Sequence, residues 1–306
     1  MLINQSNIQN LFKGFNTSFN KGIEGAASYY KDIAMRTPSS TGEENYAWLG
    51  QFPKLREWVG DRVVKNLIAN SYTIKNKTFE ETISVKRTDV EDDSYGLYGP
   101  LMTELGRAAA EYPDELVFNL MAAGFATICY DGQYFFDIDH PIKNADGTDG
   151  TASNFGGGTG TAWYLLDTSR AIKPLIYQER LPYTLTQLTA ETDENVFKRD
   201  EYLYGVRARS NVGYGLWQLA YASKQALDAT SYTAARTAMI SRKGDEGRPL
   251  GIMPDTLVVP PSLEQVARQL LNNDLIAAAG CCSQQRMERD GKVDRVAVSE
   301  LMIWSA

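Results

Sequence analysis

The residues best able to do chemistry surround the single histidine of this 306-residue chain. His140 follows two aspartates in the segment Asp137-Ile138-Asp139-His140-Pro141. A carboxylate beside an imidazole can orient it for acid–base catalysis, which would suit a soluble hydrolase centred on Asp137, Asp139 and His140. The chain has no Gly-x-Ser-x-Gly elbow to supply a nucleophile, so the sequence favours a structural role for this segment.

That structural role is a polar turn. The segment follows an aromatic strand, residues 134–136, and ends in a His-Pro bend. Because neither a second histidine nor a nucleophile is available to work with His140, we expect His140→Ala to leave any biological activity nearly intact.

Two further motifs could bind ligands. The glycine run of residues 156–160 lacks the Lys-Ser or Lys-Thr of a phosphate loop, and the whole of residues 144–161 has the composition of a mobile linker. The acidic residues 91–93 could bind a hard cation, but they are better explained as carboxylates that stabilise the start of a following helix.

The cysteines do not form a metal motif either. Cys129, Cys281 and Cys282 lack zinc-ligand spacing, with or without His140, and we expect small buried side chains. Their odd number indicates a reducing compartment. We therefore expect no catalytic residue, no cofactor and no metal.

Composition limits the possible classes of protein. Hydrophobic residues make up 43% of the chain and charged residues 23%, which is typical of one or two globular domains. The net charge of −7 argues against binding nucleic acid with the whole surface. No run of eighteen apolar residues predicts a membrane span, and the N-terminus does not have the pattern of a signal peptide. We expect synthesis and use in a cytoplasm.

The N-terminal segment has the period of an amphipathic helix. Residues 6–19 place large apolar side chains at helical spacing, with Ser6 as the candidate cap. This stripe either packs on its own domain, which periodicity alone favours, or docks on another subunit. The residues of the stripe are Ile8, Leu11, Phe12, Phe15 and Phe19.

Residues 37–62 have no helical period, yet they are strongly aromatic. Turn residues recur every few positions, and such a long irregular segment is unusual unless it has a function. Its large side chains either fold back on the core or contact another molecule. These side chains are Tyr46, Trp48, Phe52 and Trp58.

The rest of the chain predicts separated strands and helices, which indicates an α+β fold. A long helix is expected over residues 95–124, kinked or divided at Pro113. Further helices are expected over residues 230–242 and 262–272. Strands are expected over residues 71–90, 163–166, 171–177, 196–209, 214–222, 256–259 and 293–298.

Several long segments, rich in rare residues, resemble the major head (capsid) subunit of Mu-like tailed bacteriophages. Together they run over most of the chain. They include YAWLGQFPKLREWVGDR (residues 46–62), NKTFEETISVKRTDVEDDSYGLYGPL (76–101), PDELVFNLMAAGF (113–125), CYDGQYFFDIDHP (129–141), WYLLDTSRAIKPLIYQ (163–178), GYGLWQLAYASK (213–224) and PDTLVVPPSLEQVARQLLN (254–272).

This resemblance implies the Hong Kong 97-type capsid fold. It assigns residues 1–36 to an N-terminal arm and residues 37–62 to an extended loop that lies over a neighbouring subunit. It assigns residues 63–128 and 161–224 to a peripheral domain with a spine helix over residues 95–124. Residues 129–160 and 225–306 would form mainly the axial domain.

The resemblance also implies function and partners. Such a subunit assembles in the bacterial cytoplasm into hexamers and pentamers of an icosahedral virion shell around double-stranded DNA. Its expected partners are a separate scaffold and protease, a portal and a decoration protein, since the chain lacks the long scaffolding extension of some relatives. The alternatives are a bacterial nanocompartment shell of the same fold and the hydrolase centred on His140.

The extended loop yields the sharpest prediction from the sequence. Truncating a buried tryptophan to alanine costs about 3–5 kcal/mol. If the loop lies on a neighbour, that cost weakens association at every interface of the lattice rather than folding. We expect Trp48→Ala, or Trp58→Ala, to yield folded subunits or capsomers that do not close into particles. Sedimentation and circular dichroism test this, and native-sized particles from both variants would remove the loop from the interface.

Overall fold

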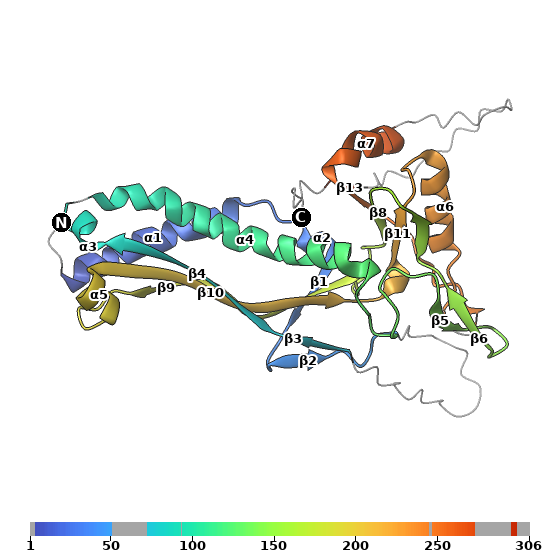
Figure 1. Cartoon of the computed structure of the whole chain (residues 1–306), viewed down its shortest axis with the longest axis horizontal. Helices are drawn as coiled ribbons and strands as arrows, with labels where there is room; N and C mark the ends of the chain where they lie inside the picture. The colour runs from blue at the N-terminus through green and yellow to red at the C-terminus, as the bar shows by residue number, and fades with distance from the viewer. Residues whose placement is uncertain (1–3, 51–71, 93, 245–246, 273–294, 299–306) are drawn as a thin grey trace.

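The longest strands of the described residues are an antiparallel pair of fourteen residues each, β9 (Leu175–Leu188) and β10 (Glu201–Tyr214). The computed structural model describes residues 4–50, 72–92, 94–244, 247–272 and 295–298. The two strands lie at the centre of a sheet in the order β1-β9-β10-β4 (Figure 1). β4 (Lys77–Lys86) pairs antiparallel with β10, and β1 (Ala34–Pro38) pairs parallel with β9.

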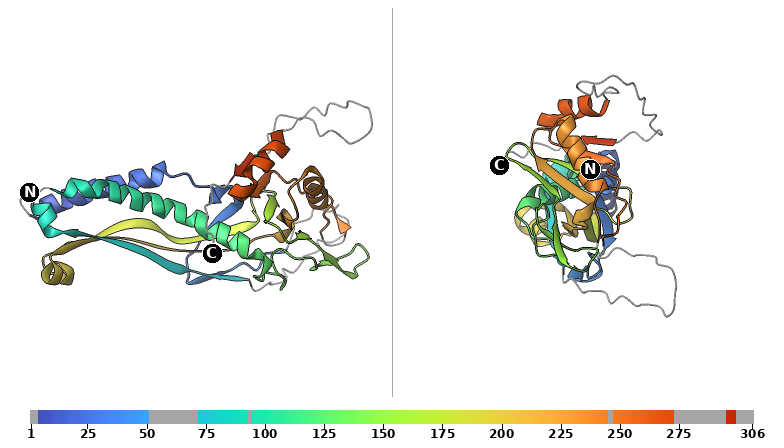
Figure 2. Two further views of the ribbon diagram at one scale, coloured as in Figure 1. Left: turned by 45° about the horizontal axis from the view of Figure 1, so that its top comes forward. Right: turned by 90° about the vertical axis from the view of Figure 1, so that its right-hand side faces the viewer.

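Two helices cover one face of this long sheet. α1 (Gln5–Gly25) and α4 (Tyr98–Ala122) run along it side by side (Figures 1 and 2). Every second residue of β10 points toward them, because side chains alternate along a strand. The resulting core contains Ile8, Leu11, Phe15, Phe19, Val85, Met102, Leu105, Tyr202, Tyr204 and Val206.

The predicted N-terminal helix is confirmed, but it begins and ends beyond the predicted bounds. Its N-cap is Asn4, whose side chain accepts a hydrogen bond from the Asn7 amide, and not Ser6. The helix continues through Gly14 and Gly22 to Gly25.

Glycines allow α1 and α4 to approach backbone to backbone. A Cβ on Gly22 would lie 2.0 Å from the Thr103 carbonyl oxygen, and one on Gly106 would lie 2.0 Å from that of Phe19. Both distances are far inside van der Waals contact. Any side chain at either position would therefore push the two helices apart.

Of the two predicted effects of Pro113 on the long helix, a kink or a division, the division is not observed. α4 runs without interruption over 25 residues, with Pro113 buried inside it. The next residue, Asp114, accepts hydrogen bonds from the backbone amides of Tyr29 (2.9 Å) and Tyr30. These amides begin the short helix α2 (Tyr30–Ile33), so a carboxylate of α4 caps α2.

A second sheet lies at the other end of the molecule, in the order β13-β12-β8-β11-β7 (Figure 1). Helices α6 (Ala229–Ile240) and α7 (Glu264–Asn272) accompany it. Its strands are β7 (Phe155–Gly158), β8 (Trp163–Leu166), β11 (Ala220–Lys224), β12 (Thr256–Val259) and β13 (Arg295–Val298).

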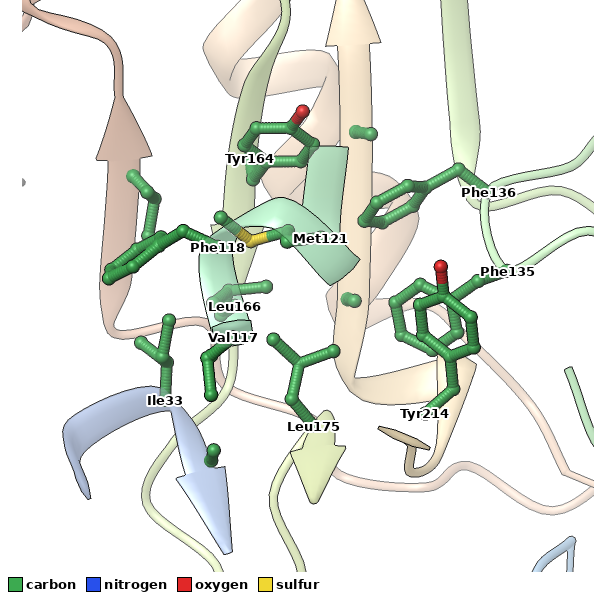
Figure 3. Packing of buried hydrophobic residues seen from close by; sticks show 14 of the residues in the cluster. Ile33, Val117, Phe118, Met121, Phe135, Phe136, Tyr164, Leu166, Leu175 and Tyr214 are labelled. Atoms are coloured by element: carbon green, nitrogen blue, oxygen red, sulfur yellow. The ribbon is translucent and has the colours of Figure 1, made fainter. Parts of the chain in front are cut away.

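One core joins the two sheets at the C-terminal half of α4 (Figure 3). Val117, Phe118 and Met121 of α4 lie between β9 and β8. Tyr214, from the end of β10, stacks on Phe135 at 4.4 Å. The two sheets therefore share a single hydrophobic core instead of meeting through a polar interface.

Two hairpins and several short elements complete the described chain. The hairpins are β2 (Glu43–Asn45) with β3 (Thr73–Lys75), and β5 (His140–Lys143) with β6 (Asp149–Ala152). The short elements are α3 (Arg87–Glu91), α5 (Glu194–Arg199), η1 (Ser94–Leu97), η2 (Ala123–Phe125), η3 (Trp217–Leu219) and η5 (Pro261–Leu263).

Several predicted elements differ from those observed. The alternation of Trp217, Leu219 and Tyr221 is shared between a 3₁₀ turn and β11, and is not one strand. Residues 196–199 are helical in α5, and residues 87–90 are helical in α3. The strands over residues 163–166 and 256–259 are confirmed.

Alanine substitutions test the close helix crossing. We expect Gly106→Ala to destabilise the subunit by about 1–3 kcal/mol or more, because the new methyl group meets rigid backbone. Gly14→Ala is the matched control on α1, where a Cβ meets nothing within 4 Å. It should stabilise the subunit by about 0.5–1 kcal/mol through helix propensity. Urea unfolding of dissociated subunits measures both changes, and equal effects would contradict the crossing.

Candidate functional site

His140 is buried and fully hydrogen-bonded. Its ring is 0% exposed and stacks on Trp217, with centroids 4.0 Å apart and planes within 8°. Nδ1 lies 2.7 Å from Asp131 Oδ2, and Nε2 lies 3.2 Å from Asn154 Oδ1. The predicted polar turn is therefore wrong at this residue, because His140 begins β5 and its alternation turns the ring into the core.

The three residues of the hydrolase hypothesis do not converge. The carboxylate near His140 is Asp131, nine residues earlier, while Asp139 is exposed. Asp137 accepts hydrogen bonds from the backbone amides of Ile138 (2.7 Å) and Tyr134 (3.3 Å). With the imidazole enclosed by Asp131, Asn154 and Trp217, a substrate has no path to it.

Cys129 joins the same buried cluster. Its thiol donates to Asp131 Oδ1 at 3.0 Å, and burial raises the pKa of the thiol well above its usual range. The prediction of a buried cysteine is confirmed here, while Cys281 and Cys282 lie outside the described residues. Cys129, Asp131 and His140 have potential metal-ligand atoms within 4.8 Å of one another, the one such group in the described part of the chain.

The glycine run belongs to a strand and not to the linker that was predicted. β7 pairs parallel with β11, and Gly158 has a φ of 94°. A Cβ there would lie 2.3 Å from the Lys224 backbone carbon. Glycine at this position therefore allows the backbones of β7 and β11 to approach closely. This packing explains the glycine without a phosphate-binding role.

Two of the acidic residues before the long helix, Glu91 and Asp92, lie at the end of α3 and not at the start of α4. Glu91 ends α3 and pairs with Arg87 at 3.3 Å. The turn η1 separates them from α4, whose first turn has no acidic residue. The predicted role at the start of that helix is therefore wrong, and Asp93 lies outside the described residues.

A hairpin closes the base of the predicted extended loop. β2 and β3 pair antiparallel, and the Tyr46 amide donates to the Tyr72 carbonyl at 2.8 Å. Tyr46 and Tyr72 therefore lie next to each other at the end of this hairpin. Glu44, beside this base, accepts hydrogen bonds from the amides of Thr41 and Ser40, and these lower its pKa to about 2.

The described part of the loop is anchored in the chain's own core. Tyr46 and Leu49 are buried, and Trp48 is partly buried and meets Tyr46 edge-on at 6.1 Å. The Tyr46 hydroxyl donates to Gln178 Oε1 at 2.9 Å. Truncation of Trp48 should therefore also weaken the subunit itself, so the interface prediction depends mainly on Trp58. Phe52 and Trp58 lie outside the described residues.

The stripe of α1 packs on its own chain. Ile8, Leu11, Phe15 and Phe19 are at most 8% exposed, and the partly buried Phe12 stacks on Tyr204 at 6.4 Å. Packing of the stripe on its own domain, the alternative that periodicity favoured, is thus the one observed. A contact of these five residues with another subunit stays a prediction.

An apolar groove lies between α4 and β4. It has a volume of about 480 Å³, and Phe79, Ile83 and Leu101 are among its apolar lining residues. Three carboxylates also line it: Glu80, Glu81 and Glu104. Sequence reasoning missed this groove, because its residues come from segments that only the tertiary structure brings together.

Solved structures define the class of protein. The chain matches a subunit of the procapsid of bacteriophage JBD30 with a TM-score of 0.81 and 51% identity, over 90% of this chain and 94% of that one. It matches the JBD30 capsid with a TM-score of 0.72 and 33% identity, over 98% and 99%. The α+β fold, with its long hairpin and long helix, is therefore that of a tailed-phage capsid subunit of the Hong Kong 97 type.

Sequence comparisons give the family. The chain is 47% identical to the Mu-like prophage FluMu major head subunit of Haemophilus influenzae, over 92% of this chain and 94% of the relative. It is 43% identical to the major capsid protein of Escherichia phage Mu, over 98% and 100%. The family model of the Mu-like prophage major head subunit gpT matches residues 8–293, and the chain belongs to this family.

Membership makes the chain a structural subunit of the virion shell and not an enzyme. The nanocompartment and hydrolase alternatives are set aside by the same findings. Within the described ranges, no helix combines the length and apolar character needed to cross a membrane.

The buried position of His140 gives His140→Ala a cost in stability, while the expectation that activity stays nearly intact remains a prediction. Removing the ring leaves Asp131 without its partner and opens a space beside Trp217. We expect a loss of about 2–4 kcal/mol in subunit stability. Asp139→Ala, at the exposed neighbouring residue, should change stability by less than about 0.5 kcal/mol. Thermal unfolding of both variants tests this, and a neutral His140→Ala would restore the original interpretation.

Proposed function

We propose that the chain assembles into hexamers and pentamers of an icosahedral shell that encloses double-stranded phage DNA. The observation that carries this proposal is the 51% identity and shared fold with a procapsid subunit. The net charge of −7 suits this role, because an acidic subunit does not trap packaged DNA on its surface. Assembly in the bacterial cytoplasm belongs to the same proposal.

Electron microscopy of purified protein tests shell formation directly. Closed particles of uniform diameter are the expected result, and persistent monomers under conditions that assemble Mu-like heads would contradict the proposal. Particles produced during infection should contain nuclease-protected double-stranded DNA.

The division into domains follows the two sheets. We propose residues 1–36 as the arm and 37–62 as the extended loop. The long sheet and α4, within residues 63–128 and 161–224, would form the peripheral domain, and residues 129–160 and 225–306 mainly the axial domain. Since β8 and β11 pair within the second sheet, we place these two strands with the axial domain.

We further propose that the extended loop of one subunit packs on its neighbour, with the α4–β4 groove as the receiving surface. Residues 51–62 combine apolar side chains such as Trp58 with three basic and two acidic residues, a net charge of +1; these are Lys54, Arg56, Arg62, Glu57 and Asp61. The groove presents the matching chemistry, an apolar floor with three carboxylates. Opposite charges across such a contact would set its register.

The other partners come from the family and one relative. We propose a separate scaffold, a protease, a portal and a decoration protein. A JBD30 capsid decorated with minor capsid protein trimers matches this chain with a TM-score of 0.70 and 35% identity, over 85% of this chain and 88% of that one, which supports the decoration protein.

Charge reversal in the groove tests the receiving surface. We expect Glu104→Arg to leave folded subunits that form particles poorly, because basic loop residues would then face a like charge. Glu24→Arg, an exposed change on α1 outside the groove, is the matched control and should assemble normally. Sedimentation and negative-stain images measure assembly. Equal particle yields from both variants would show that the α4–β4 groove does not receive the loop.

A further inference from the structure

The cluster of Cys129, Asp131 and His140 has no part in the proposed shell contacts. Its sulfur, carboxylate oxygen and ring nitrogen all lie within 4.8 Å of one another. Cys129 is 4% exposed, His140 is 0% exposed, and the Asp131 side chain is 9% exposed. Three groups that can each lose a proton therefore lie together in the core that joins the two sheets.

The neighbouring asparagine determines which ring nitrogen of His140 carries a hydrogen. Asn154 Nδ2 donates to the Phe135 carbonyl at 2.7 Å, and Asn154 Oδ1 accepts from the Asp137 amide at 2.8 Å. The oxygen of Asn154 therefore faces His140, and Nε2 must be its donor at 3.2 Å. A neutral imidazole with its hydrogen on Nε2 has a lone pair on Nδ1.

That lone pair points at a carboxylate. Nδ1 lies 2.7 Å from Asp131 Oδ2, a distance at which two acceptors repel unless a cation lies between them. At this distance a proton joins the two atoms, and a metal ion bound by both would take the place of that proton and hold them farther apart. The Cys129 sulfur lies 3.0 Å from the other carboxylate oxygen. It is a third potential metal ligand, and it would bind a metal ion as the deprotonated thiolate.

We propose that Cys129, Asp131 and His140 form a structural Zn²⁺ site. A thiolate, an imidazole nitrogen and a carboxylate oxygen are the ligand types that zinc takes in proteins, at about 2.0–2.3 Å. Asn154 would hold the ring orientation through Nε2, and the Gln133 amide, 3.1 Å from Asp131 Oδ1, would hold the carboxylate. A water molecule or the second Asp131 oxygen would take the fourth position.

The exchange of protons for zinc balances in charge. Before binding, the cluster holds a thiol, a carboxylate and a doubly protonated ring, with no net charge. Zn²⁺ displaces the thiol proton and the Nδ1 proton, and both go to solvent. The loaded site contains Zn²⁺, one thiolate, one carboxylate and a neutral ring, again with no net charge. Burial therefore does not disfavour the loaded state over the empty one through charge.

The site would fasten the loop that carries Phe135 and Phe136 to the base of β5. Both phenylalanines are in the core that joins the two sheets. Cys129 and Asp131 come from the start of that loop and His140 from its end, so one ion would close a segment of twelve residues, 129–140. Zinc should thus raise the thermal stability of the junction.

Metal content of the full-length protein tests the site. Cys281 and Cys282 are first replaced by serine, so that Cys129 is the remaining thiol. We expect one zinc per chain by plasma mass spectrometry after folding in the presence of zinc. Cobalt in its place should give a thiolate-to-cobalt charge-transfer band. A chelator should lower the melting temperature of this protein.

Cys129→Ser in the same background is the matched variant, because serine keeps a hydrogen-bond donor toward Asp131 but removes the thiolate. It should lose the bound zinc, the charge-transfer band and the chelator effect. If the parent folds with zinc in excess and still holds none, the proposal is overturned, and a proton alone joins His140 to Asp131. That result would not depend on whether particles form.

Discussion

The packing of the C-terminal half of α4 between two sheets is the interaction on which the rest of the structure depends. Val117, Phe118 and Met121 contribute to one core with strands of both sheets (Figure 3). Because these side chains exclude water from both sides at once, the long hairpin and the second sheet cannot separate without exposing the same core. A shell subunit needs such a link, since a contact at one end must fix the orientation of the other end.

Side-chain burial distinguishes the residues that pack within the subunit from those at its surface. The apolar stripe of α1 is buried within the chain, where the Phe15 ring packs edge-on against Tyr204 with centroids 5.0 Å apart. The base of the extended loop is likewise anchored through Tyr46 and Gln178. The α4–β4 groove, by contrast, combines apolar side chains with carboxylates at the surface.

Buried polar groups near the core that joins the two sheets stabilise local structure. Asp114 caps a short helix with its carboxylate, and burial raises the pKa of that group. Asp131 lies between Cys129 and His140, and Asn154 fixes the ring from the other side. The donors to Asp114 come from a distant segment, residues 29 and 30, whereas those to Asp131 come from within its own loop, and in both cases the contacts form in one arrangement of the chain.

The class of the fold and most of its elements follow from local patterns of residues. Helical spacing predicted α1, apolar runs predicted β8 and β12, and the resemblance of long segments predicted a phage capsid subunit. These signals are local, because a helix or strand repeats its apolar positions every few residues.

Which of these elements meet is evident from the packed structure and not from those local patterns. It joined Asp131 to His140 where the sequence had suggested Asp137 and Asp139, and it placed the glycine run in a strand beside β11. It also revealed why Gly22 and Gly106 lack side chains. In each case the partner comes from another part of the chain, and no local spacing records a contact that forms only when separate elements pack together.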